Sequence, residues 1–91
     1  ITSGASFNLA GFDQTIARLV GVAGATVTND SAVAADAATL TISAGGGVFA
    51  GNLTEVGGDV LSLTKSVTGT QTLSGSGNTY TGTTTVSGGV L

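Results

Sequence analysis

Apolar and polar residues alternate along several short stretches of this chain. Val60–Lys65 reads Val-Leu-Ser-Leu-Thr-Lys, and Ala38–Ser43 reads Ala-Thr-Leu-Thr-Ile-Ser. Alternation with a period of two predicts β-strands that bury one face. Together with the turn residues between them, this pattern predicts strands over Ser6–Leu9, Gln14–Val20, Ala25–Asn29, Ala38–Ser43, Gly47–Thr54, Val60–Lys65, Thr70–Ser74, Thr79–Tyr80, Thr83–Ser87 and Val90–Leu91.

Glycines separate the predicted strands, as at Gly45–Gly47, Gly57-Gly58 and Gly88-Gly89. Glycine supplies the positive-φ conformations that corners between short strands need. The stretch Ala32–Ala38 is compatible with one helical turn. Its Val33 and Asp36 favour a loop or an extra strand that bulges from the coil.

A Thr-x-Thr-aliphatic-Ser motif recurs at Thr39–Ser43, Thr70–Ser74 and Thr83–Ser87. The first and third copies start 44 positions apart. Counted as two turns, this gives roughly 22 residues per turn, within the range of solenoid coils. Short strands with regular turns are also compatible with a sandwich, but the aliphatic spacing and the stackable Thr and Ser favour a parallel solenoid. We therefore predict about four rungs and a rod roughly 20 Å long.

The spacing also predicts which side chains stack inside the coil. One aliphatic column is expected to contain Ile1, Val20 or Val22, Ile42, Leu61 or Leu63, and Val86, and a second to contain Leu9, Val27, Phe49, Leu73 and Leu91. Ile42, Leu63, Leu73 and Val86 are expected to point inward, and Lys65, Thr72 and Thr85 outward.

The composition narrows the possible partners. The net charge is -3 and only two residues are Lys or Arg, which argues against nucleic acid and anionic membrane, because both attract clustered basic residues. No apolar run reaches the roughly 18 residues that a membrane-spanning helix needs. Cysteine is absent, which excludes disulfides and thiolate metal sites. We interpret residues 1–91 as a single module of a longer protein.

The few charged side chains offer little catalytic chemistry. Asp13 and Arg18 are candidates for a surface ion pair worth at most about 1 kcal/mol. With no His or Cys, the chain lacks a thiol nucleophile and the base that most often activates a hydroxyl nucleophile. Two acidic sets, Asp30 with Asp36 and Glu55 with Asp59, are candidate calcium ligands, but no Gly-Gly-x-Gly-x-Asp recurrence supports them. We predict solvated turn carboxylates and no catalytic, cofactor or metal site.

The asparagines and the aromatic residues offer further candidate contacts. Asn8, Asn29, Asn52 and Asn78 are spaced along the coil, and Asn52 or Asn78 is a candidate for bonding to the next rung; Asn29 and Asn52 also fit a glycosylation sequon. The aromatic residues are compatible with a sugar-stacking platform but are expected in the core, with Tyr80 at a turn; they are Phe7, Phe12, Phe49 and Tyr80.

The Thr-x-Thr copies also suggest the flat threonine array of ice-binding solenoids. Such an array needs one copy in every rung. The 31- and 13-residue gaps between the copies predict that no regular face forms.

The end of the chain carries the clearest family signal. Leu61–Lys65 and Gly69–Gly75 are followed by Asn78-Thr79-Tyr80-Thr81-Gly82, a threonine-rich strand and Gly88-Gly89-Val90-Leu91. This run closely resembles the autotransporter-associated β-strand repeat, the passenger-associated repeat of bacterial autotransporter-type surface proteins. Phe7–Ile16 is similar to the opening of the same unit, whereas Thr83 stands where a second glycine is common. The resemblance implies a right-handed parallel β-helix exposed outside a bacterial cell.

These observations predict a structural module rather than an enzyme. The expected role is a segment of a rigid extracellular stalk or fibre, with neighbouring copies of the module as partners, in tandem or as a homopolymer. The alternative is an adhesin module that recognises a glycan or a cell-surface protein through the Ala32–Asp36 excursion or the threonine-rich surface. Neither nucleic acid nor direct membrane contact is expected.

Overall fold

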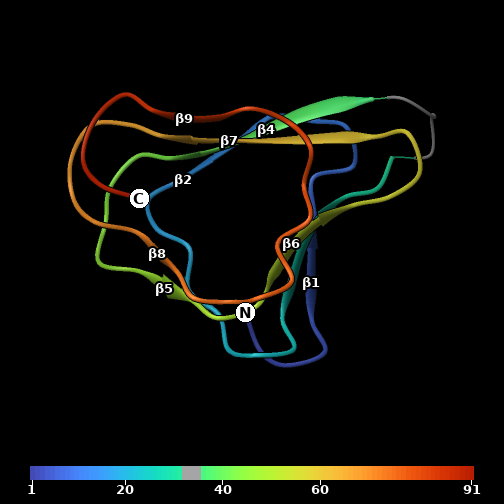
Figure 1. Cartoon of the computed structure of the whole chain (residues 1–91), viewed down its shortest axis with the longest axis horizontal. Coiled ribbons are helices and arrows are strands. Elements are labelled where there is room, and N and C mark those ends of the chain that lie inside the picture. Colours follow the sequence, from blue (N-terminus) through green and yellow to red (C-terminus); the bar gives the residue numbers. More distant parts are fainter. Residues whose placement is uncertain (32–35) are drawn as a thin grey trace.

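The chain winds into a parallel β-solenoid in the computed structural model, which describes residues 1–31 and 36–91. Viewed along the shortest axis, it runs anticlockwise toward the viewer around a triangular cross-section, the sense of a right-handed coil (Figure 1). The Cα extents are 34 × 27 × 18 Å. The shortest extent agrees with the predicted length of the rod along its axis.

Three parallel sheets form the sides of the triangle. Their strands, in spatial order, are β1 (Ser6–Asn8), β3 (Thr26–Asn29) and β6 (Asn52–Glu55) in the first, β2 (Gln14–Ile16), β4 (Ala37–Ile42), β7 (Val60–Lys65) and β9 (Thr84–Val86) in the second, and β5 (Val48–Phe49) and β8 (Thr72–Leu73) in the third. The coil makes about three turns. The second sheet crosses four rungs because the described chain starts and ends partway round a turn.

The strand predictions succeed where the alternation is strict. Val60–Lys65 has the predicted bounds, and β4 is shifted by one residue. The predicted strand Gly47–Thr54 is wrong as one element, because the chain turns a corner at Ala50-Gly51 and passes from β5 to β6 in another sheet. Thr79–Tyr80 forms no strand, and Val90 makes only an isolated bridge, with Thr70. The predicted excursion at Ala32–Asp36 lies mostly outside the described residues.

The columns of the core are only partly as predicted. Phe49 does stack on Leu73, but Val27 stacks between Phe7 and Leu53 rather than with Leu9 and Phe49. The reason is that the rungs differ in length: 20 residues separate Ser6 from its partner Thr26, whereas 26 separate Thr26 from Asn52. The core itself is aliphatic with one phenylalanine, and comprises Leu9, Leu19, Ala25, Val27, Ala38, Leu40, Ile42, Phe49, Leu53, Leu61 and Leu63.

The inward and outward predictions hold for most positions. Ile42 and Leu63 are buried, Leu73 is half-buried, and Thr72 and Thr85 are exposed. Val86 stacks in the inward column but is 51% exposed, because β9 is the edge strand of its sheet and no described strand covers it.

Lys65 was expected to face outward, and this prediction is wrong. Strand β7 buries every second residue, so Lys65 follows Leu61 and Leu63 into the coil and is fully buried. Its ammonium group donates hydrogen bonds to the carbonyl oxygens of Ser66, at 3.0 Å, and Thr68, at 2.6 Å. The local alternation therefore outweighs the preference of a charged side chain for water.

Candidate functional site

One face of the solenoid carries hydroxyl groups in ordered columns. On the outer side of the sheet β2-β4-β7-β9, the ladder register places Thr15 beside Thr41, Thr41 beside Thr64, and Thr64 beside Thr85. Neighbouring parallel strands lie about 4.8 Å apart, so the four threonines form a straight column along the coil axis. No hydroxyl of this column makes a hydrogen bond within residues 1–31 and 36–91.

Two further columns flank these threonines on the same face. Outward positions lie two residues apart along each strand, a separation of about 6.7 Å. On one side Thr39 pairs with Ser62, and on the other the backbone N–H groups of Ser43, Ser66 and Ser87 each donate to the preceding rung. We call the whole surface the hydroxyl face; it comprises Asp13, Thr39, Ser62 and Thr83, then Thr15, Thr41, Thr64 and Thr85, then Ala17, Ser43, Ser66 and Ser87.

The expectation that no regular threonine face forms is therefore wrong for this sheet. Thr70 and Thr72 do lie elsewhere: Thr72 is in β8 on another side of the triangle, and Thr70 precedes that strand. Their place in the array is taken by Ser62 and Thr64 of β7, which do not form a complete Thr-x-Thr motif. The pairing of β4 with β7 completes the face, because it places Ser62 beside Thr39 and Thr64 beside Thr41.

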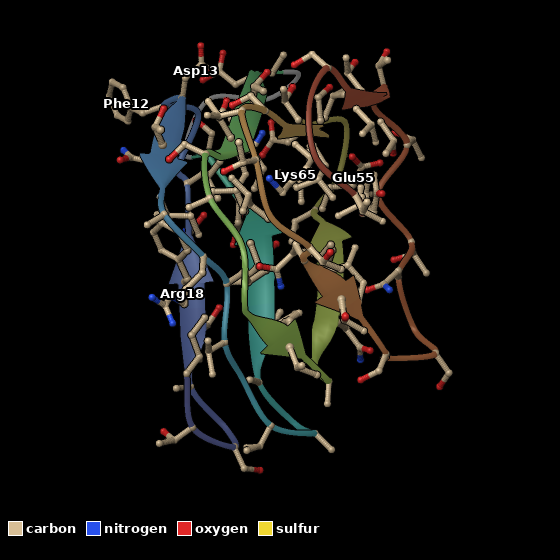
Figure 2. All side chains as sticks on the ribbon, turned by 90° about the vertical axis from the view of Figure 1, so that its left-hand side faces the viewer. Phe12, Asp13, Arg18, Glu55 and Lys65 are labelled. Carbon is tan, nitrogen blue, oxygen red and sulfur yellow. The ribbon has the colours of Figure 1, made fainter. Side chains whose placement is uncertain are left out.

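Asp13 and Arg18 do not form the predicted ion pair. Asp13 lies at the first rung of the hydroxyl face, where its Oδ1 accepts a hydrogen bond of 2.8 Å from the N–H of Thr39. Figure 2 shows Arg18 lower on the same side, well away from Asp13. Asp13 therefore accepts a hydrogen bond from the N–H of Thr39 instead of pairing with Arg18.

The acidic residues near the excursion bind backbone groups of their own chain. Asp59 is 4% exposed, and its carboxylate accepts from the N–H of Ser31 at 2.7 Å and from the N–H of Asp36 at 3.0 Å. This carboxylate therefore joins the two ends of the excursion to the third rung. Both carboxylate oxygens of Asp59 accept hydrogen bonds from backbone N–H groups, whereas in a calcium site such oxygens face the cation.

Glu55 fastens the corner after β6 to the last rung. Its carboxylate accepts from the N–H of Leu61 at 2.7 Å, from the N–H of Thr81 at 3.0 Å and from the Thr81 hydroxyl. Partial burial acts to raise the pKa of Glu55, and the charge of Asp59 acts in the same direction. The hydrogen bonds from Thr81 and Leu61 prevail and hold the pKa of Glu55 below its ordinary value.

The asparagines bridge successive rungs. Asn78 Oδ1 accepts from the N–H of Leu53 at 2.9 Å, and Asn52 Oδ1 accepts from the N–H of Gly77 at 3.2 Å, so the predicted inter-rung bonds of both are confirmed. Fully buried Asn29 reaches furthest, with Oδ1 accepting from Gly11 in the first rung and Nδ2 donating to Val60 in the third. Burial also removes Asn29 from consideration as a glycosylation site in the folded protein.

A buried glutamine was missed by the sequence reasoning. Gln71 is fully buried and clasps Leu19 from two rungs away: its Oε1 accepts from the Leu19 N–H at 3.0 Å and its Nε2 donates to the Leu19 carbonyl at 2.7 Å. The side chain passes Gly47 of the intervening rung. A Cβ atom on Gly47 would lie 2.5 Å from the Leu19 oxygen and 2.6 Å from Oε1, so only glycine leaves room.

The aromatic side chains form no platform. Phe49 is fully buried, Phe7 and Tyr80 pack partly against the core, and the Tyr80 hydroxyl shares a 2.8 Å hydrogen bond with Thr84. Phe12 is the exception to the predicted core packing. It is 71% exposed and projects outward beside Asp13 (Figure 2).

The described part of the chain contains no enclosed site. Residues 1–31 and 36–91 form no pocket and no cluster of three or more His, Cys, Asp or Glu side chains. Within the same ranges, no helix has the length and apolar character needed to cross a bilayer.

Comparison with known proteins agrees with this geometry. Residues 63–91 match the family model described as the passenger-associated-transport-repeat. Over 92 aligned residues the chain is 42% identical to the "Adhesin BmaC autotransporter" of Brucella suis biovar 1 (strain 1330), an alignment that covers 98% of this chain and 2% of that protein. No solved structure matches. Residues 63–91 are therefore of the passenger-associated-transport-repeat type, and the chain is similar over nearly its whole length to a short stretch of an autotransporter adhesin.

Proposed function

We propose that this segment is a structural module of a bacterial surface protein, in which it extends a rigid solenoid stalk by stacking on neighbouring rungs. The observation that carries the proposal is the exposure of an inward-facing side chain in the last rung. Val86 stacks on fully buried Lys65 and faces into the coil, yet it is 51% exposed. One further rung on β9 would cover this side chain and pair the strand edge.

The interior of the coil supports the proposed rigidity of the stalk. Within each of the three sheets, backbone hydrogen bonds join neighbouring strands along the coil axis. The side chain of Gln71 adds hydrogen bonds to a rung two turns away, and that of Asn29 bonds to the rungs on both sides. Each rung therefore holds its neighbours through the backbone, the core and buried amides together. In such repeat architectures, stability arises from contacts between adjacent units.

The family match and the adhesin relative support placement outside a bacterial cell. The segment spans 2% of that relative, so the activity of the whole protein is a matter for the full chain. We further propose that the segment has no enzymatic activity, because the carboxylates of Asp13, Glu55 and Asp59 accept hydrogen bonds from backbone N–H groups and the chain has neither His nor Cys.

Sedimentation of the purified segment, with two matched variants, tests the stalk proposal. The wild-type segment is expected to associate end to end as its concentration rises. Val86→Asp places a charge on the inward column of the open rung and should abolish this association, whereas Thr85→Asp changes the adjacent outward residue and should preserve it. Circular dichroism verifies that each variant is folded. A cooperatively folded wild-type monomer that persists at high concentration would contradict the proposal.

A further inference from the structure

We propose that the hydroxyl face is a docking surface for an extended, uncharged polysaccharide. This inference goes beyond the stalk role and does not depend on it. It starts from the ladder register, which aligns Thr15, Thr41, Thr64 and Thr85 in four consecutive rungs. The neighbouring columns are serine or threonine at every position except Asp13 and Ala17.

The chemistry of the face selects an uncharged, hydroxylated partner. Asp13, at one end, is its single charged residue, so the face exerts no attraction on phosphate, sulfate or carboxylate polymers. The four central hydroxyls make no hydrogen bond to the described part of the chain, and each offers one donor and two acceptor lone pairs. Sugar hydroxyls match this capacity in both directions, while the threonine methyl groups contact the C–H faces of the rings.

The geometry selects a long partner rather than a small glycan. No pocket is formed by residues 1–31 and 36–91, so a mono- or disaccharide has no cavity to fill. The columns instead repeat about every 4.8 Å along the axis and about 6.7 Å across it. A polymer that lies on this face makes many weak, repeated contacts, whose effects combine because they are linked.

The side chains of the face are suited to bind without much ordering. Threonine is β-branched and restricted at χ1, and the flanking rungs limit it further, so little rotamer freedom is lost on binding. A second copy of the same face is the less favourable occupant. Stacking two such surfaces would remove many free hydroxyls from water, and unmatched buried hydroxyls are unfavourable. The face of one module, of the order of 300 Å², is also well below the roughly 800 Å² per partner of a stable protein interface.

The test compares two pairs of threonine-to-valine changes in the full chain that carries this segment. Thr41→Val with Thr64→Val removes two central hydroxyls and keeps a β-branched side chain. Thr26→Val with Thr54→Val is the control, because these two threonines are equally half-buried and point outward on the sheet β1-β3-β6. Each protein is co-sedimented with microcrystalline cellulose, chitin and insoluble β-1,3-glucan, and with an anionic polysaccharide gel for comparison.

We expect retention of the wild type on at least one neutral polysaccharide and not on the anionic gel. The Thr41/Thr64 pair should weaken this retention by about tenfold, as expected for two lost neutral hydrogen bonds, and the Thr26/Thr54 pair should not. Equal effects of the two pairs, or no retention on any neutral polysaccharide, would overturn the proposal. A change in self-association caused only by the Thr41/Thr64 pair, without a change in retention, would assign the face to a second copy. Inhibition of ice growth by the wild type, without retention on any polysaccharide, would identify ice as the partner of the hydroxyl face.

Discussion

Replacing Gln71 with leucine is the most direct test of how the rungs are held together. Gln71→Leu is close in volume but removes both amide groups from a fully buried position. Leu19, itself 2% exposed, then loses the acceptor of its N–H and the donor to its carbonyl. The bonds span 52 residues and two rungs, so their loss should loosen the first rung from the third.

The magnitude follows from the two orphaned groups. A buried backbone donor or acceptor left without a partner costs about 1–3 kcal/mol. Two such groups give about 2–6 kcal/mol, reduced somewhat by the more favourable burial of leucine. Since small domains unfold with about 5–15 kcal/mol, this change should remove a large share of the stability.

Urea unfolding of the purified segment measures the effect, and hydrogen exchange at the Leu19 amide localises it. The matched control is Gln14→Leu, because Gln14 is exposed in the first rung and its side chain makes no hydrogen bond within the described ranges. We expect Gln71→Leu to shift the urea midpoint strongly and to expose the Leu19 amide, with Gln14→Leu near neutral. Equal urea midpoints for the two variants, with the Leu19 amide still protected from exchange, would refute a stabilising role for the hydrogen bonds between Gln71 and Leu19.

Three further changes test the same structural reasoning. Gly47→Ala should destabilise the segment by about 1–3 kcal/mol in urea unfolding, because its new Cβ enters the space between Gln71 and Leu19; an unchanged midpoint would contradict this. The folded-state pKa of Glu55 is lowered, so the stability from its hydrogen bonds is present above its ordinary pKa of 4.5 and is lost as the pH falls through the lower folded value. Melting temperatures measured against pH should show this loss, and the Glu55→Gln variant should show a smaller dependence of the melting temperature on pH. Lys65→Met should melt at or above the wild type, because it fills the same space without a buried charge, whereas Lys65→Ala should melt lower; equal melting of the two variants would show that the ammonium bonds dominate.

The sequence alone determined the class of structure because its signals are local. Strict alternation placed strand Val60–Lys65 at its observed bounds, and recurring threonine motifs with glycine corners indicated stacked coils. The same alternation also contained the correct direction of Lys65, two positions after Leu63. The prediction that it points outward relied on its charge, whereas the period of the strand was the stronger constraint.

The tertiary structure decided the register and everything that depends on it. Rungs of 20 and 26 residues cannot be aligned by counting, because corner lengths vary while the ladder requires only that the strands meet. That register brought Thr64 between Thr41 and Thr85 to complete the hydroxyl face, and set Gln71 against Leu19 past Gly47. Both arrangements are contacts between residues distant in the chain, and such contacts arise only when the coil closes.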